Sequence, residues 1–309
     1  MKEEKQATRE AYGEALKEVG KDNKNIVVLD SDLAGATKSS TFKKEFPDRF
    51  FDMGISEQDM IGTAAGMATC GKIPFASTFA VFATGRAYDQ IRNSVCYPKL
   101  NVKICGSHSG ITVGEDGATH QMLEDINIMK ALPNMKVFCP SDGVQTKWVV
   151  KNASKEEGPC YIRTCRLATN IIYDENQKFE EGKMVVHGDG TDATIFATGV
   201  TVVESLKAQA ELEKEGILVR VVDVFTLKPI DKDTIIKCAK ETKRLISVED
   251  HNIIGGLGSI IADVLVEEYP CKLTKMGIKD CFGESGKANV LLEKYEIDSK
   301  AIINEVKKG

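Results

Sequence analysis

The fold is decided by residues 52–68, which read DMGISEQDMIGTAAGMA. The run leads from the end of an apolar strand through a turn into a helix of small residues, whose Gly and Ala positions allow close approach of a backbone or a cofactor. Ser56 followed by Asp59 is a capping-box variant, which predicts a helix with Glu57 at its first position. Glu57 then either faces a ligand at the edge of an open α/β sheet or only complements the helix dipole.

The same alternation of Val/Ile-rich runs with helix-period segments continues along the chain. It predicts an α/β fold of two consecutive domains, each a mostly parallel sheet flanked by helices. The first domain, residues 1–168, is predicted to hold strands at 26–32, 50–54, 73–79, 102–108, 136–141 and 160–166, and helices at 8–19, 57–70, 83–96, 124–131 and 143–154.

An acid-rich segment without strong periodicity, residues 169–192, is predicted to be a linker. The second domain then covers residues 193–309. Its predicted strands are 193–198, 218–225, 244–249 and 273–277, and its predicted helices are 202–215, 231–239 and 258–267 with two short C-terminal helices.

Composition excludes several classes of protein. The chain has 309 residues, 42% of them hydrophobic and 28% charged, which is ordinary for a globular protein with a core. A net charge of −5 gives no basic field for nucleic acid or an anionic membrane. The N-terminus lacks the apolar core of a signal peptide, so we expect a cytoplasmic protein. Nine scattered cysteines without a C-x-x-C pair suggest neither disulfides nor a zinc site.

A second polar segment, residues 106–121, reads GSHSGITVGEDGATHQ and follows an apolar strand. His108, Asp116 and His120 stand there in an H-x7-D-x3-H spacing that fits no common metal template. Such histidines can be purely structural, but a loop at a strand end is a better place for function than the core. The loop therefore favours hydrogen bonding to a polyhydroxy or phosphorylated ligand, with no metal site.

Arginines gather at two predicted element ends. Arg163 and Arg166 close the sixth strand, and Arg9 opens the first helix. Guanidinium groups suit bidentate phosphate binding. A surface ion pair is the alternative for each of them.

Five motifs together resemble the transketolase family: GISEQ at 54–58, STF at 77–79, GEDGATHQ at 114–121, PSD at 140–142 and FGES at 282–285. The resemblance runs from about residue 7 to the end and covers the family's pyrimidine-binding and C-terminal domains. The resemblance does not include the first domain of the family, which binds the diphosphate of the cofactor and its metal ion. Residues 188–190, GDG, look like the start of the metal-diphosphate motif, but residues 191–220 contain no Asn, so we interpret them as a turn.

The resemblance implies a role for each matching position. Glu57 matches the glutamate that binds N1′ of the thiamine diphosphate pyrimidine, and Phe79 and Phe82 match aromatic residues around that ring. Asp32 falls where the family has an acid near the thiazolium. His108, Asp116 and His120 match residues that hold sugar hydroxyls and phosphate, with Glu57, His108 and His120 in catalysis, and Arg9 and Arg166 match phosphate-binding arginines.

Two positions depart from the family pattern. Gly85 stands where many transketolases have a third aromatic residue, and residues 86–90, RAYDQ, are closer to deoxyxylulose-phosphate synthase. Ala36 stands where a phosphate-binding serine is usual, with Thr37 as a substitute. Both departures concern the substrate more than the cofactor.

The resemblance implies the C-terminal subunit of a split transketolase of the pentose phosphate pathway, which moves a two-carbon ketol unit between sugar phosphates. An N-terminal subunit would supply the remaining contacts to the cofactor and most of the ligands of its Mg²⁺ or Ca²⁺ ion. The two subunits would form a heterotetramer with two copies of each chain. Two alternatives stay open. They are a subunit of a related thiamine enzyme, similar to deoxyxylulose-phosphate synthase or to a 2-oxo acid dehydrogenase β chain, and a non-catalytic regulatory or binding paralogue.

Overall fold

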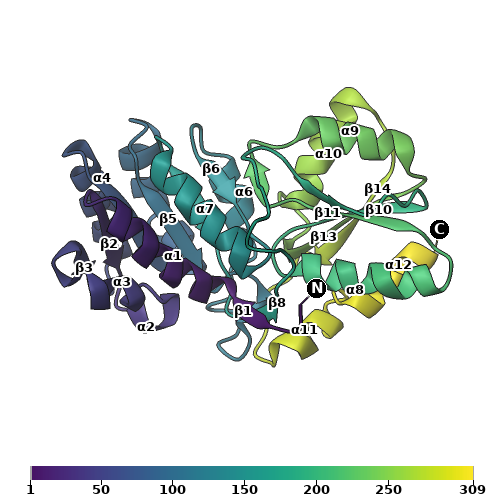
Figure 1. Ribbon diagram of the computed structural model, residues 1–309, viewed down its shortest axis with the longest axis horizontal. Coiled ribbons are helices and arrows are strands. Elements are labelled where there is room, and N and C mark those ends of the chain that lie inside the picture. Colours follow the sequence, from purple (N-terminus) through teal and green to yellow (C-terminus); the bar gives the residue numbers. More distant parts are fainter. Residues whose placement is uncertain (1, 309) are drawn as a thin grey trace.

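The computed structural model describes residues 2–308. Figure 1 shows two α/β units side by side, the first in purple to teal and the second in green to yellow. The predicted fold class, mostly parallel sheets flanked by helices, is confirmed. Within these residues every helix is too short or too polar to cross a lipid bilayer.

The larger sheet has seven strands in the order β12-β6-β7-β5-β4-β2-β3, parallel except for β12. A parallel sheet covered on both faces requires apolar side chains in both directions, and the central strands meet this requirement. The strands are β2 (Ile26–Asp30), β3 (Phe50–Asp52), β4 (Ile73–Phe79), β5 (Lys103–Ser107), β6 (Lys136–Phe138), β7 (Cys160–Arg163) and β12 (Thr226–Lys228).

Alternating side chains of this sheet enter different hydrophobic clusters. Ile26 and Val28 of β2 belong to one cluster, and Val27 and Leu29 to another. The first face packs against α1 (Thr8–Asp22), α3 (Ser40–Glu45) and α7 (Gly143–Lys155). The second packs against α4 (Glu57–Thr69), α6 (Asp125–Lys130) and the π-helical turns η2 (Phe82–Arg86) and η3 (Ile91–Cys96). Shorter helical pieces are α2 (Ala34–Thr37), η1 (Pro47–Arg49), α5 (Tyr88–Gln90) and η4 (Ile111–Val113).

The second sheet has five strands in the order β14-β13-β10-β11-β9, parallel except for β9. They are β9 (Val185–His187), β10 (Ala193–Ala197), β11 (Val219–Asp223), β13 (Leu245–Asn252) and β14 (Leu273–Ile278). One face packs against α8 (Thr201–Lys214), α11 (Ala288–Lys294) and α12 (Ser299–Lys307), and the other against α9 (Lys232–Glu241) and α10 (Leu257–Glu268). A short antiparallel pair joins β1 (Lys5–Ala7) to β8 (Ala168–Asn170).

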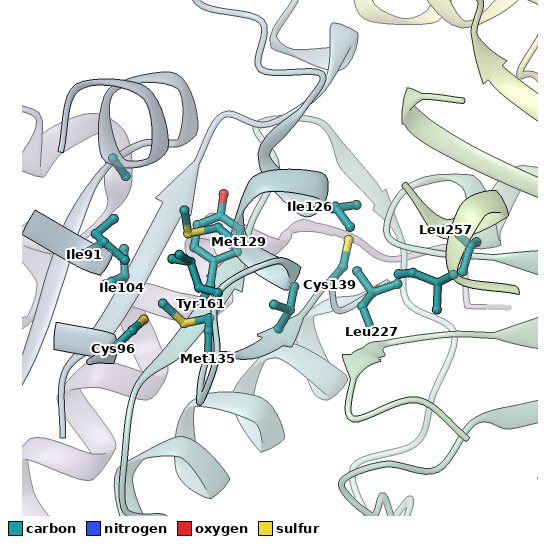
Figure 2. Packing of buried hydrophobic residues seen from close by; sticks show 14 of the residues in the cluster. Ile91, Cys96, Ile104, Ile126, Met129, Met135, Cys139, Tyr161, Leu227 and Leu257 are labelled. Carbon is teal, nitrogen blue, oxygen red and sulfur yellow. The ribbon is translucent and has the colours of Figure 1, made fainter. Parts of the chain in front are cut away.

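One hydrophobic core runs through both units. Figure 2 shows side chains of the first unit, such as Ile104 and Tyr161, in one cluster with Leu227 and Leu257 of the second. Leu227 belongs to β12, which pairs antiparallel with β6 and extends the first sheet. The two units are therefore joined by shared apolar packing and by backbone pairing.

Three details differ from the sequence-based expectations. The first domain is predicted with six strands, but β12 adds a seventh from the second half of the chain. Part of the predicted linker is β9, which pairs with β11. The helix expected at 83–96 is interrupted by π-helical turns, which are frequent at functional sites. These pieces are short and depend on distant partners, so local periodicity gives little signal for them.

Candidate functional site

The candidate residues lie where strands of the larger sheet end. Asp32 follows β2, Glu57 follows β3 after a turn, Phe79 is the last residue of β4, His108 follows β5 directly and Arg166 follows β7. Carboxyl ends of parallel strands meet at one edge, which is where open α/β sheets bind ligands. The topology therefore gathers these positions on one side of the sheet.

Glu57 is the first residue of α4 and its side chain is turned inward, with only 3% of the residue exposed. Its two carboxylate oxygens accept hydrogen bonds from one nitrogen of Arg86, at 3.2 and 3.3 Å. Together with Ile55, Ser56 and Gln58, the two residues line an open pocket. A buried carboxylate with a single cation partner beside open space is an unusual arrangement for a simple helix-dipole charge.

The predicted cap at Ser56 is wrong. The serine occupies the N-cap position, but its side chain makes no capping hydrogen bond. Its backbone has ψ of 66°, away from the extended region that capping serines use, so the hydroxyl does not reach the helix amides. Glu57 is therefore placed by the turn and by Arg86, rather than by a capping box.

Two phenylalanines form a flat aromatic stack next to Arg86. The rings of Phe79 and Phe82 are nearly parallel, with an interplanar angle of 9° and centroids 5.8 Å apart. The guanidinium carbon of Arg86 lies 4.1 Å from the centroid of the Phe82 ring, a cation–π arrangement. His120 packs edge-on against both rings, with its ring centroid 6.0 Å from that of Phe79 and 5.4 Å from that of Phe82. Arg86 thus links Glu57 to an aromatic pair that His120 also contacts.

His108 also stacks on Phe79, with ring centroids 3.9 Å apart. Nη1 of Arg9 donates to its Nε2 at 3.1 Å, so the ring proton is assigned to Nδ1, which lies 2.9 Å from the Ser107 hydroxyl. Burial, and then the positive charges of Arg9 and Arg166, lower the pKa of His108 to about 3. The imidazole is therefore neutral at physiological pH.

Arg9 and Arg166 bring positive charge to the same end of the site. Arg9 also donates to the backbone oxygen of Ala36 at 3.0 Å. Arg166 donates to the backbone oxygen of Val113 at 3.0 Å and lies 3.5 Å from a carboxylate oxygen of Asp116. The structure therefore brings Asp116 and Arg166 together as a half-exposed pair at the rim.

Not every sequence-based candidate joins this group. Asp32 is exposed, and within residues 2–308 its carboxylate has no hydrogen bond or ion pair. Thr37 is wrong as a substitute for the phosphate-binding serine, because it is fully buried and its hydroxyl donates to the buried Asp30 at 2.7 Å. Arg163 is also unavailable to a ligand, since it is buried against Asp125 at 2.8 Å.

Family models match most of the chain. Residues 4–171 match the transketolase pyrimidine-binding domain, and residues 182–302 match the transketolase C-terminal domain. The chain belongs to the transketolase family. The predicted family is therefore confirmed, and the function of this family, ketol transfer, implies dependence on thiamine diphosphate.

This transketolase chain resembles relatives of about its own length and also relatives about twice as long. It is 52% identical to a Methanocaldococcus jannaschii protein described as a transketolase C-terminal section, over 97% of this chain and 96% of that protein. It is 43% identical to rat transketolase, covering 98% of this chain but only 49% of the rat protein. The first match confirms the prediction that the chain corresponds to the C-terminal section of a split transketolase.

Solved structures agree with this division. The fold matches a structure described as "Split gene transketolase, inactive beta4 tetramer" with a TM-score of 0.91 and 51% identity, covering 98% of this chain and 97% of that one. A split gene implies a partner subunit that carries the N-terminal part of the enzyme. The Campylobacter jejuni transketolase, at 23% identity and a TM-score of 0.85, shares the fold over 47% of its own length.

The residues present fit the pyrimidine end of the family cofactor. A parallel aromatic stack suits a flat heteroaromatic ring, and a buried carboxylate suits a ring nitrogen that takes up a proton. Gly85 belongs to η2, like Phe82, and has open space where a side chain would project. For the metal, residues 2–308 contain no group of three or more His, Cys, Asp or Glu side chains placed to hold an ion.

Sequence reasoning missed two sets of residues that shape this transketolase site. Arg86 stood in a motif noted only as a departure, yet it is the ion-pair partner of Glu57. Asp250 and the backbone of Glu284 contact the 106–121 loop from the second domain. No local pattern could reveal these contacts, because Arg86 is 29 residues from Glu57 and the second-domain partners are more than a hundred residues from the loop.

Proposed function

We propose that this chain carries the pyrimidine side of a thiamine diphosphate site. Together with an N-terminal transketolase subunit, it transfers a two-carbon ketol unit from a ketose phosphate to an aldose phosphate. The observation that carries the proposal is the buried carboxylate of Glu57, which pairs with Arg86, whose guanidinium in turn lies over Phe82 of the stacked aromatic pair. A helix-dipole role alone would not require burial of the charge.

The cofactor, when bound, supplies the thiazolium carbon that takes up the two-carbon unit. Glu57 holds a proton at N1′ of the aminopyrimidine, which is general acid-base catalysis relayed through the ring. Phe79 and Phe82 hold the ring plane and exclude water from one side. Asp32 takes the place near the thiazolium that the family gives to an acid.

The remaining candidates face the sugar phosphate. His108 and His120 act on its hydroxyl groups, and His108 does so as a neutral ring because burial and two arginines disfavour its protonation. Asp116 holds a hydroxyl group, and Arg9 and Arg166 bind phosphate oxygens as charge-assisted donors. The packing of His108 against Phe79 and of His120 against Phe82 supports this assignment.

The partner subunit supplies the diphosphate contacts and most ligands of a Mg²⁺ or Ca²⁺ ion, in a heterotetramer with two copies of each chain. The domain limits proposed for this chain are 1–168 and 193–309, with a cytoplasmic location and a place in the pentose phosphate pathway. A structure of a similar split transketolase chain is described as an inactive β4 tetramer, which supports the expectation that one chain type is insufficient.

The test compares the purified chain with the chain co-expressed with its N-terminal subunit. Each sample receives thiamine diphosphate and Mg²⁺, and is assayed with xylulose 5-phosphate and ribose 5-phosphate. We expect ketol transfer only from the complex, and none from the chain alone. Full activity of the chain alone would contradict the split-subunit proposal, and activity with pyruvate as donor in its place would indicate a deoxyxylulose-phosphate synthase-like enzyme.

A further inference from the structure

A carboxylate of the second domain holds the loop that carries the sugar-phosphate candidates. Oδ1 of Asp250, in β13, accepts a hydrogen bond from the amide of Ile111 at 2.8 Å. Oδ2 accepts from the hydroxyl of Thr112 at 2.8 Å and from its amide at 3.4 Å. All three donors belong to the single 3₁₀ turn η4, which connects His108 to the stretch containing Asp116 and His120.

The backbone of the loop is shaped for this carboxylate. Gly110 has φ of 75°, and a Cβ atom there would lie 2.1 Å from Oδ2 of Asp250. Only glycine can adopt this φ angle and also leave room for the Asp250 carboxylate next to its Cα atom. Any side chain at Gly110 would therefore displace the turn from the carboxylate of Asp250.

Asp250 is itself held rigidly. It is 1% exposed, and its backbone oxygen accepts from Nη2 of Arg163 at 2.9 Å. Arg163 in turn pairs with the buried Asp125 at 2.8 Å. The strand that carries the carboxylate is thus held to the first domain by a hydrogen bond from Arg163, whose own position is fixed by the buried ion pair with Asp125, and this leaves the carboxylate little freedom to follow a moving loop.

The last residue of the turn, Val113, contacts Arg166. The backbone oxygen of Val113 accepts from Nη1 of Arg166 at 3.0 Å. Two carboxylates beyond the turn, Glu115 and Asp116, lie 3.7 and 3.5 Å from the same nitrogen. Because both carboxylates are exposed, their ion pairs with Arg166 restrain its guanidinium only weakly. The carbonyl of Val113, in the anchored turn, therefore fixes the guanidinium better than either carboxylate does.

We propose that Asp250 is a positioning residue for substrate phosphate: it fixes the η4 turn, and through the carbonyl of Val113 it orients the guanidinium of Arg166. The inference rests on the proposed function, since it assumes that Arg166 binds phosphate. It assigns the second domain a task in substrate recognition although Asp250 itself touches no substrate.

The test uses Thr112→Val, Asp250→Asn and a matched control, Thr242→Val. Thr112→Val removes one hydroxyl from the anchor and keeps the side-chain shape. Thr242 lies in the second domain, like Asp250, and its hydroxyl donates to the backbone oxygen of Cys238 at 2.8 Å, near the amino end of β13. If Asp250→Asn does not fold, Thr112→Val still tests the proposal.

Hydrogen–deuterium exchange of the full chain is the first measurement. We expect the amides of Ile111 and Thr112 to exchange at least about fivefold faster in Thr112→Val and faster still in Asp250→Asn, because each loses hydrogen bonds to the turn. Thr242→Val should exchange there like the wild type. Unchanged exchange in both anchor variants would overturn the proposal.

Kinetics of the two-subunit complex are the second measurement. In Thr112→Val the KM for ribose 5-phosphate should rise about three- to tenfold, while kcat and the Kd for thiamine diphosphate stay within about twofold. The KM for unphosphorylated glycolaldehyde as acceptor should not change. Equal changes for both acceptors, or none, would overturn the proposal, whereas a wild-type complex that cannot transfer ketol units would instead refute the proposed function.

Discussion

The two ends of the candidate site are held in place by different parts of the chain. The Glu57 end is built within the first domain, from a strand end, the start of α4 and the neighbouring Arg86 and Phe82. The Arg166 end depends on the second domain, through Asp250 on the η4 turn. The proposed chemistry and the proposed substrate recognition can therefore be disturbed separately.

The largest expected effect is at the Glu57 end. Glu57→Gln keeps size and much of the hydrogen bonding but cannot exchange a proton with N1′. We expect kcat of the complex to fall by at least about 100-fold, the low end of what general acid-base groups contribute. The melting temperature should be nearly unchanged. A variant that keeps more than about a tenth of the activity would reduce Glu57 to a helix-dipole charge.

At the other end, Arg166→Ala should affect binding more than chemistry. Loss of a charge-assisted bond to phosphate costs about 1.5 to 3 kcal/mol, which corresponds to a rise in KM of roughly 10- to 150-fold for phosphorylated sugars. An unphosphorylated donor should be affected far less. Arg92→Ala, an exposed arginine on η3, is the control. Equal losses for both donor types would assign Arg166 a structural role.

His108 is buried beside Arg9, and its titration gives a smaller effect on stability. Its folded pKa of about 3 is below the ordinary value of 6.5. Between these values the unfolded chain binds a proton that the folded chain does not, so this group lowers the free energy of unfolding as the pH falls from 6.5 toward 3.

His108→Gln should therefore lose stability less steeply in acid than the wild type. The difference in slope is expected to be about 1 kcal/mol per pH unit below pH of about 6, measured by urea unfolding. Both proteins contain the same other titratable groups, so the difference between their slopes of unfolding free energy against pH reports His108 alone. These other groups include Asp30, whose pKa is raised by burial to about 6. Parallel curves for the two proteins would contradict a buried neutral His108.

The smallest effect is expected at Ser56. Because its side chain makes no capping bond, Ser56→Ala should change the free energy of unfolding by less than about 0.5 kcal/mol. Asp298→Ala is the matched control, since Asp298 caps α12 by accepting from the amide of Ala301 at 3.0 Å. Its loss should cost about 1 kcal/mol. Equal costs for the two variants would restore a cap at Ser56.

Most of the fold could be predicted from the sequence because doubly covered strands are continuous apolar runs. Ile73–Phe79 begins and ends as predicted, whereas β12 and β9 have three residues each and pair only with distant strands. Within the site, the stretch around Glu57 is visible because its elements are adjacent in the chain. The contacts of Arg86, Asp250 and Thr37 were not visible, since each depends on a side chain brought close only by tertiary packing.

The strand β12 has a consequence for any attempt to divide the molecule. If the chain is cut after residue 181, β6 loses the antiparallel neighbour that now covers its backbone, and Leu227 leaves the core shown in Figure 2. Unpaired edges and exposed apolar surface favour aggregation. The two halves should therefore melt in a single cooperative transition, and neither is a safe candidate for separate expression.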